Sequence, residues 1–401
     1  MHTTTAIIIG GGIAGPIAAL ALRRAGIDAT IYEAYARTAD GVGGMLSIAP
    51  NGIDALAAIG FDATTLGEPV ETMIIADANG RSLATIPTLA GLPPSRVLFR
   101  ADLYRSIADY ALANGVRFVY GKRLVAIKET PERIVAQFAD DDWVSGDILI
   151  GADGIRSTVR ALIDPNAPHA RHVGHIGFGG LAIGSGFHGV PRAMYFANGN
   201  RAFMGYWTQA DGNTVWFANV PHAEAMTSAE ARETSNDEWL GRLRELFADD
   251  LPGRDLLAHT DAATLLVAGS GEMLPTVPHW YKGRAVLVGD SAHAPSSSSG
   301  QGVSMAAESA VELARCLRDI PHRGDAFATY EALRRPRVEK VAAFGARNNQ
   351  SKVAGPVAKT LMRVIMPIAM KTFLSPEKMF RWMHGHHIEW EAAVHRQSAA
   401  A

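Results

Sequence analysis

The first thirty residues of the chain constrain its fold more than any other part. An apolar run at residues 6–9 leads into Gly10-Gly11-Gly12-Ile13-Ala14-Gly15, and a helix pattern follows with Pro16 in its first turn. A pyrophosphate can reach a helix N-terminus only where the turn carries no Cβ atoms, and the helix dipole favours its negative charge. The pattern therefore predicts a strand, a tight turn and a helix that bind an adenine dinucleotide. The predicted contacts are Gly10, Gly12, Ala14 and Gly15.

An acidic residue at the end of the second predicted strand narrows the choice of dinucleotide. Glu33 follows Gly15 by 18 residues, at a place where a carboxylate can accept hydrogen bonds from an adenosine ribose. An acid there disfavours a 2′-phosphate, so FAD or NAD is favoured over NADP. The alternative is an ordinary glycine turn with no ligand.

A second glycine cluster favours FAD. An apolar strand pattern over residues 284–289 leads to Asp290, and Gly300-Gln301-Gly302-Val303 then opens a helix pattern. Asp290 is suited to bind the hydroxyls of a ribityl chain, while backbone N–H groups at Gly302 and Val303 face the electron-rich pyrimidine edge of a flavin. In the alternative interpretation, Asp290 caps a helix and His293 lies in a surface loop.

A third motif, Gly151-Ala152-Asp153-Gly154, again indicates a strand that runs into a turn and a helix. In this order and spacing the three motifs resemble the FAD-dependent class A monooxygenases of the para-hydroxybenzoate hydroxylase type. The resemblance extends to Arg100-x-x-Leu103 and to Tyr330-Glu331-x-x-Arg334-Arg335-Pro336, and so covers residues 1 to about 340. It implies that Arg100 contacts the FAD and that Asp153 belongs to the cofactor site.

Two positions depart from the family's pattern. A proline usually stands four residues after the Gly-Asp histidine, beside the flavin, whereas this chain has Ser297 there and its proline at Pro295. An acid usually stands nine residues beyond the first glycine of the second pair, where this chain has Ser309. Neither departure threatens FAD binding. They leave open how the oxygen intermediate is handled and what the following helix contacts.

The resemblance also implies a reaction. Members of the family bind NADH or NADPH transiently, and this chain has no second Gly-x-Gly-x-x-Gly pattern for a resident nicotinamide. Their reduced flavin traps O2 as a C4a-hydroperoxide, which inserts one oxygen atom into a substrate by hydroxylation, epoxidation or Baeyer–Villiger insertion. The cofactor carries this chemistry, so no catalytic protein residue is assigned. A flavin dehydrogenase or reductase on the same scaffold, and a flavin-bound sensor without turnover, remain the alternatives.

The pattern along the chain predicts an α/β fold. It combines a doubly wound FAD-binding lobe, an interleaved antiparallel β-sheet substrate lobe and helices that continue to the C-terminus. Asn79-Gly80 marks a hairpin, and strand-like runs rich in glycine and aromatic residues fill 171–268. We assign 1–70, 96–170 and 277–345 to the FAD-binding domain, 71–95 and 171–276 to the substrate domain, and 346–401 to a C-terminal helical segment.

Aromatic residues and methionines indicate the class of substrate. Met362, Met366 and Met370 recur at a spacing of four, which places them on one face of a helix that could line an adaptable apolar pocket. The other interpretation is that this face packs on another lobe or a second subunit. We predict a hydrophobic, aromatic or polyketide-like substrate, as in secondary metabolism. The aromatic residues of the predicted substrate sheet are Tyr195, Phe196, Phe203, Tyr206, Trp207, Trp216 and Phe217.

Composition excludes several other classes of protein. The 38 basic and 40 acidic residues leave a net charge of −2, which argues against a nucleic-acid partner. The single cysteine, Cys316, cannot form an intramolecular disulfide, so we expect a reducing, cytoplasmic setting. We expect no membrane span, because charges and a proline interrupt the apolar run at 353–374. The sequence leaves monomer and homodimer open.

Two smaller clusters of residues could be mistaken for a metal site and a hydrolase active site. His384, His386 and His387 lie near the C-terminus, but no carboxylate or cysteine stands at ligand spacing. We therefore expect a solvated tract and no metal site. The serine run at 296–299 lacks the Gly-x-Ser-x-Gly elbow of a hydrolase, so a polar turn beside the flavin is the better interpretation.

Overall fold

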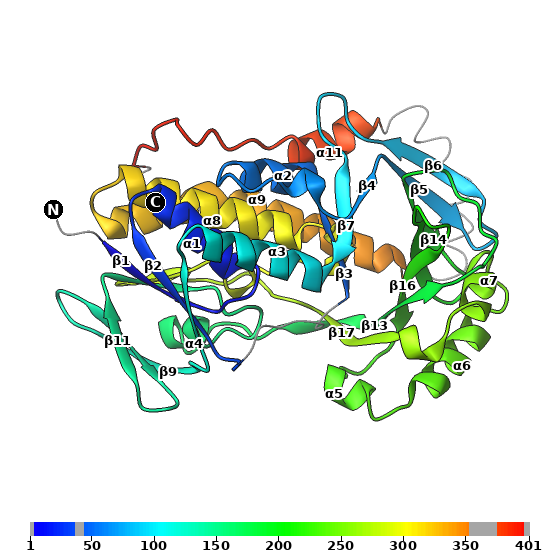
Figure 1. Ribbon diagram of the computed structural model, residues 1–401, viewed down its shortest axis with the longest axis horizontal. Helices are drawn as coiled ribbons and strands as arrows, with labels where there is room; N and C mark the ends of the chain where they lie inside the picture. The colour runs from blue at the N-terminus through cyan, green and yellow to red at the C-terminus, as the bar shows by residue number, and fades with distance from the viewer. Residues whose placement is uncertain (1–3, 37–43, 353–374, 397–401) are drawn as a thin grey trace.

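The protein consists of two lobes that lie side by side (Figure 1). The computed structural model describes residues 4–36, 44–352 and 375–396. Strands from well-separated parts of the chain meet in each lobe, so the lobes are interleaved in sequence. This arrangement confirms the predicted fold class. The bounds of the two domains and of the C-terminal segment stay predictions.

A mostly parallel sheet organises the first lobe. Its strand order is β18-β19-β12-β1-β2-β8, and β18 runs antiparallel to β19. Ile8, Leu149 and Val286 on its central strands are fully buried, as expected for a sheet that is covered on both faces. The strands are β1 (Thr5–Ile9), β2 (Asp28–Glu33), β8 (Arg117–Tyr120), β12 (Ile148–Gly151), β18 (Tyr281–Lys282) and β19 (Ala285–Leu287).

Different layers cover the two faces of this sheet. Helices α1 (Ala14–Arg24), α3 (Arg100–Ala113) and α8 (Gly302–Asp319) pack over one face (Figure 1). The other face carries helix α4 and a small antiparallel sheet, so only one face has the helical layer of a regular doubly wound fold. These elements are α4 (Thr158–Ile163), β9 (Leu124–Glu129), β10 (Ile134–Phe138) and β11 (Trp143–Gly146).

A seven-stranded sheet forms the second lobe, in the order β17-β13-β16-β15-β14-β5-β6. The predicted hairpin at Asn79-Gly80 joins β5 to β6 and is confirmed. One pair departs from the predicted antiparallel sheet, because β5 enters from the other lobe and runs parallel to β14. The strands are β5 (Thr72–Asp77), β6 (Ser82–Pro87), β13 (Arg171–Ala182), β14 (Ala193–Asn198), β15 (Phe203–Thr208), β16 (Thr214–Pro221) and β17 (Leu266–Met273).

The two faces of this sheet pack against different partners. One face holds Tyr206 and Trp216 in a core with Trp239, and helices cover it: α5 (Ser228–Ala231), α6 (Asn236–Leu246) and α7 (Gly253–Ala258). The opposite face carries Trp207 and Met194 and packs toward the first lobe. A small connecting sheet with helix α2 lies there, made of β3 (Met45–Ile48), α2 (Pro50–Ala57), β4 (Glu68–Val70) and β7 (Ser95–Phe99).

Long helices follow α8, but the predicted helical run to the C-terminus is wrong near its end. Helix α9 (Arg323–Lys352) and helix α11 (Pro376–His384) are present, whereas residues 385–396 form neither helix nor strand. Side chains of α8 bind the backbone there instead: Arg318 donates to the Trp390 carbonyl at 2.6 Å and Arg315 to that of Ala392 at 2.9 Å. The predicted methionine face at 362–370 lies outside the described residues.

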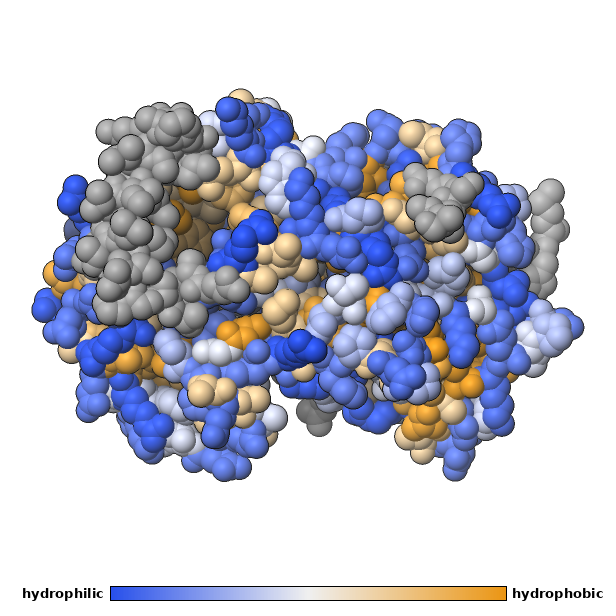
Figure 2. All heavy atoms as spheres, turned by 180° about the vertical axis from the view of Figure 1, so that it is seen from behind, coloured by the Kyte–Doolittle hydropathy of each residue, from blue (hydrophilic) through white to orange (hydrophobic). Residues whose placement is uncertain are grey.

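The surface carries mixed polar and apolar patches. Figure 2 shows hydrophilic residues over most of the rear face, with apolar groups between them and a notch between the two lobes along the lower edge. Among the described residues, no helix combines the length and the apolar character that crossing a membrane requires.

Truncation of a central tryptophan should destabilise the second lobe. Trp216 is fully buried and donates its indole N–H to Thr260 at 2.9 Å, so Trp216→Ala should lower the free energy of unfolding by about 3–5 kcal/mol. Trp143→Ala is the matched control, because its side chain is 45% exposed on β11, and should cost about 1 kcal/mol or less. Denaturant unfolding measures both. Equal losses would contradict the assigned core.

Candidate functional site

The glycine turn between β1 and α1 brings backbone atoms together where no side chain would fit. Gly10 has a φ of +104°, and a Cβ on Gly15 would lie 2.0 Å from the Gly10 carbonyl oxygen. A Cβ on Gly12, by contrast, would meet no described atom within 4 Å. Helix α1 starts beside this space with no side-chain cap on its N–H groups from the described residues. The turn therefore presents free backbone donors to open space, as a pyrophosphate site requires.

Glu33 closes the turn from the end of β2. Its Oε2 accepts the Gly11 N–H at 2.6 Å, and its Oε1 accepts the Tyr35 N–H at 2.9 Å. These bonds fix the carboxylate beside the turn, and each oxygen keeps a further lone pair for a hydroxyl donor. The placement suits the predicted contact with a ribose, and it shows that Glu33 also holds the glycine turn in shape.

Asp290 lies close to the starts of both α1 and α8, because its neighbour Gly289 packs against Ala14 and Ala306. It sits in a single turn of 3-10 helix, η3 (Gly289–Ser291), directly after β19. Its surface is open to solvent, yet the surrounding protein raises the pKa of Asp290 to about 6, while the positive charge of Arg100 lowers it. A carboxyl group that is enclosed and still accessible is the expected state of a cofactor contact before the cofactor is bound.

Close packing joins the Asp290 loop to the glycine turn. A Cβ on Gly289 would lie 3.0 Å from that of Ala14 at the start of α1 and 3.2 Å from that of Ala306 in α8. The structure thus brings the first and second glycine motifs together. Arg100 begins α3 and makes no ion pair within the described ranges, so its guanidinium stays available to a ligand.

The N-terminus of α8 opens beside Asp290. Gly300 adopts a left-handed φ of +63°, and Gln301 is buried beneath the turn. No described side chain caps the helix, and a Cβ on Gly302 would meet nothing within 4 Å. The N–H groups of Gly302 and Val303 are therefore free to face an electron-rich edge.

Asp153 has a supporting position. Its Oδ1 accepts the Ser157 hydroxyl at 2.5 Å and its Oδ2 accepts the Val159 N–H at 3.0 Å, so both oxygens hold the start of α4. Burial raises the pKa of this carboxyl, and these bonds act against that shift. From α4, Arg160 donates to the Ser291 carbonyl at 3.0 Å and so supports the Asp290 loop. A direct contact between Asp153 and a cofactor remains a prediction.

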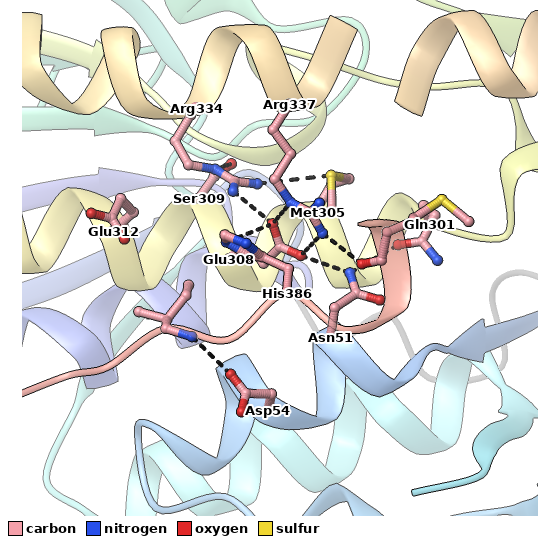
Figure 3. Close-up of polar contacts among 12 residues, drawn as sticks. Asn51, Asp54, Gln301, Met305, Glu308, Ser309, Glu312, Arg334, Arg337 and His386 are labelled. Carbon is pink, nitrogen blue, oxygen red and sulfur yellow. Dashed lines mark hydrogen bonds and ion pairs between the residues drawn. The ribbon is translucent and has the colours of Figure 1, made fainter. Parts of the chain in front are cut away.

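A buried ionic cluster beside α8 was not predicted from the sequence (Figure 3). The fully buried Glu308 carboxylate pairs with Arg334 at 2.6 Å and with Arg337 at 2.7 Å. Asn51 of α2 donates to Glu308 at 2.7 Å and to the Gln301 side chain at 2.9 Å. Burial alone would raise the pKa of Glu308, but the two guanidinium groups hold that pKa well below its usual range.

Ser309, one of the departures from the family pattern, joins this cluster to the Asp290 loop. Its hydroxyl lies 2.8 Å from His293 Nε2 and accepts from Arg334 Nε at 3.3 Å. His293 is buried, so the alternative of a surface-loop histidine is wrong. Burial and the nearby Arg334 lower the pKa of His293 to about 3, which keeps the ring neutral. Ser297, the other departure, is exposed at the start of the 3-10 turn η4 (Ser297–Ser299).

The C-terminal histidines differ from the predicted solvated tract. The ring of His384 stacks on Phe380, and His386 Nε2 lies 3.8 Å from Glu308, because residues 376–396 pack on the first lobe. His387 alone is exposed, and it bonds Asp54 at 2.6 Å. No group of three or more metal-binding side chains occurs in the part of the chain that the structure describes.

The assembled residues fit FAD. Two helix N-termini without side-chain caps, at α1 and α8, have open space at positions 12 and 302. Gly289, which directly precedes Asp290, packs against Ala14 of α1 and Ala306 of α8, and Glu33 holds the other side of the glycine turn. A pyrophosphate, a ribityl chain and a flavin edge need donors and acceptors in this order.

Comparison with known proteins shows what this fold and site define. A family described as "FAD binding domain" matches residues 3–345, so the chain belongs to this family. Within it, the chain is an FAD-dependent class A monooxygenase, an oxidoreductase that holds FAD. NAD(P)H is the typical reductant of this class.

Several relatives cover nearly the whole chain. The FAD-dependent urate hydroxylase of Klebsiella pneumoniae is 31% identical over 348 residues, which is 83% of this chain and 86% of the relative. The aurachin C monooxygenase/isomerase of Stigmatella aurantiaca is 28% identical and covers 86% and 89%. Among solved structures, a variant of Klebsiella pneumoniae HpxO complexed with FAD has a TM-score of 0.79 at 26% identity, covering 92% of this chain and 98% of that chain.

Two glycine variants should separate folding from cofactor binding. Gly12→Ala adds a methyl group to open space and should leave the apoprotein's unfolding curve within about 1 kcal/mol of wild type, while FAD affinity falls at least tenfold. Gly15→Ala places its Cβ 2.0 Å from the Gly10 carbonyl oxygen and should lower stability itself. Denaturant unfolding and FAD titration measure the two effects. A Gly12→Ala protein with wild-type FAD affinity would show that the cofactor does not pass this point.

The raised pKa of Asp290 predicts a pH-dependent stability difference. The folded apoprotein binds a proton at Asp290 more tightly than the unfolded chain does, because that pKa rises from 3.8 to about 6. Asp290 therefore opposes folding increasingly as the pH rises through this window. Apoprotein carrying Asp290→Asn should be more stable than wild type at pH 8, and the difference should vanish near pH 4. Thermal unfolding of both proteins across this range tests the sign.

Proposed function

We propose that the protein uses NADH or NADPH and O2 to insert one oxygen atom into a hydrophobic, aromatic or polyketide-like small molecule. The observation that carries the proposal is the pair of uncapped helix N-termini at α1 and α8, which have open space at positions 12 and 302 and lie close to the Asp290 loop. The other lobe turns an apolar sheet face toward this side of the molecule. A site of this kind binds a flavin beside a dry substrate pocket.

The predicted FAD contacts have separate tasks in this proposal. Gly10, Gly12, Ala14 and Gly15 let the pyrophosphate approach the N-terminus of α1, and Glu33 accepts from the adenosine ribose. Asp290 accepts from ribityl hydroxyls, and Arg100 adds a positive charge beside it. The N–H groups of Gly302 and Val303 donate to the pyrimidine edge of the ring, and the loop of Gly300 and Gln301 sets their position.

When bound, FAD supplies hydride acceptance from NAD(P)H and activation of O2. The protein contributes orientation and the exclusion of water. Trp207 and Met194 are buried on the sheet face toward the first lobe, and Phe196 and Phe217 border them. An apolar wall of this kind keeps water from a reactive oxygen species and favours transfer to substrate.

The same wall supports an apolar substrate. Phe196, Phe203 and Phe217 form an aromatic group with ring centroids 6.0 to 6.5 Å apart. Aromatic side chains at such distances offer offset or edge contacts to a further ring. Relatives named as a urate hydroxylase and an aurachin C monooxygenase/isomerase are similar to this chain in sequence, which supports an aromatic substrate.

The cellular setting is part of the proposal. Cys316 is a buried free thiol, and burial raises the pKa of this thiol far above its usual value. A protein with one unreactive cysteine does not need an oxidising compartment, which supports a cytoplasmic enzyme.

Isotope labelling tests the reaction. The purified holoprotein should oxidise NAD(P)H slowly alone and at least tenfold faster with a matching aromatic compound, and the product should carry one atom from ¹⁸O2. A panel of fused-ring and single-ring compounds, with benzoates as the charged control, should show preference for the apolar members. Stimulated NAD(P)H oxidation without label in any product would favour the dehydrogenase or reductase alternative.

A further inference from the structure

The buried cluster around Glu308 carries a surplus of positive charge. One carboxylate, Glu308, faces two guanidinium groups, Arg334 at 2.6 Å and Arg337 at 2.7 and 2.8 Å (Figure 3). The two histidines beside it stay neutral, because burial lowers the pKa of His293 to about 3 and that of His386 to about 4. The cluster therefore holds one uncompensated positive charge at neutral pH.

A short chain of hydrogen bonds links this cluster to the N-terminus of α8. The amide nitrogen of Asn51 donates to Glu308 at 2.7 Å and to the Gln301 side chain at 2.9 Å. Gln301 directly precedes the first residue of α8. Glu308 lies six residues into the helix, about 9 Å along its axis. The charge thus stands behind the helix end that faces the proposed pyrimidine edge.

A second branch reaches the Asp290 loop. Arg334 donates to Ser309 at 3.3 Å, and the Ser309 hydroxyl lies 2.8 Å from His293 Nε2, three residues after Asp290. The cluster therefore contacts both segments that border the proposed flavin position. Neither branch passes through solvent, because Asn51, Gln301, Ser309 and His293 are all at most 5% exposed.

The C-terminal segment shields the cluster. Arg337 donates to the carbonyl groups of Trp382 and Met383 at 3.0 and 2.8 Å, so the end of α11 rests on its guanidinium. The side chain of Arg334 is 2% exposed and that of Arg337 is 12% exposed. Charges in such surroundings act over longer distances than surface charges, and salt screens them weakly.

We propose that the Glu308–Arg334–Arg337 cluster is a redox-tuning element that raises the flavin's reduction potential. This inference rests on the proposed placement of the flavin. Reduction adds negative charge to the pyrimidine edge of the ring, while the oxidised ring is neutral. A fixed positive charge behind α8 stabilises the reduced form more than the oxidised one, in the same sense as the helix dipole. Glu308 moderates the effect and orients both guanidinium groups.

Two charge changes of opposite sign test this inference. Glu308→Gln removes a negative charge and should raise the midpoint potential of the bound FAD, whereas Arg337→Gln removes a positive charge and should lower it. Both variants break the same ion pair, so general loosening of the site would shift the two potentials in the same direction. Potentials are measured on the holoprotein without substrate, by equilibration with reference dyes.

Glu312→Gln is the matched control. Glu312 lies one turn further along α8 and is a buried carboxylate paired with Arg315 at 2.8 Å. Within the described chain, its carboxylate accepts hydrogen bonds from Arg315 and makes none to Gln301 or His293. Its variant should raise the potential less than Glu308→Gln does, because its charge lies about 6 Å further along the helix axis. Arg337→Lys, which keeps the charge, should keep the wild-type potential. Should Glu308→Gln fail to fold, the comparison of Arg337→Gln with Arg337→Lys decides the question alone.

The outcomes separate this inference from the proposed function. An Arg337→Gln potential equal to or above that of wild type, with FAD still bound, would overturn the tuning role and leave the monooxygenase proposal standing. Absence of ¹⁸O in products would overturn the proposed reaction and leave the measured potentials meaningful. A wild-type protein that retained no FAD would overturn both.

Discussion

The approach of the Gly10 carbonyl to Gly15 is the contact on which the rest of the first lobe depends. It seats the start of α1 directly on the end of β1, with no side chain between them. Because α1 begins this close to the end of β1, Gly289 can pack against Ala14, and α8 can lie beside α1. The N-termini of both helices then lie close to the Asp290 loop. The proposed cofactor site is thus a consequence of backbone proximity more than of any single polar side chain.

Burying Glu308 adds a second constraint that acts over longer distances. A lone carboxylate in this position would be very costly, so partners from α2 and α9 must reach it, and α11 must cover them. Residues as far apart in the sequence as Asn51 and His386 therefore meet at Glu308. The C-terminal segment consequently helps to enclose the cluster beside the proposed cofactor site, although it lies at the far end of the sequence.

Local patterns in the sequence predicted most of the fold. The strand at 6–9, the helix with Pro16 in its first turn and the hairpin at Asn79-Gly80 form as predicted, because apolar runs and turn residues are short-range signals. The glycine motifs likewise predicted the turns that precede α1 and α8. The Glu308 cluster escaped prediction because the partners of Glu308 are distant in the sequence: Arg337 lies 29 residues away and Asn51 lies 257 residues away. Nor does any periodic pattern mark 385–396, whose backbone is held by arginines of α8.

The departure at position 309 shows how one residue redirects a helix face. Successive residues of an α-helix point about 100° apart, so an acid at 308 cannot face what an acid at 309 would face. In this chain the serine at 309 faces His293, and the acid turns toward Asn51 and the guanidinium groups of α9. Arg334, which the family motif supplies, is paired with an acid from the next position along α8, and Arg337 shares that acid. The single carboxylate offsets one of the two positive charges, and Gln301 gains its link to the cluster through Asn51.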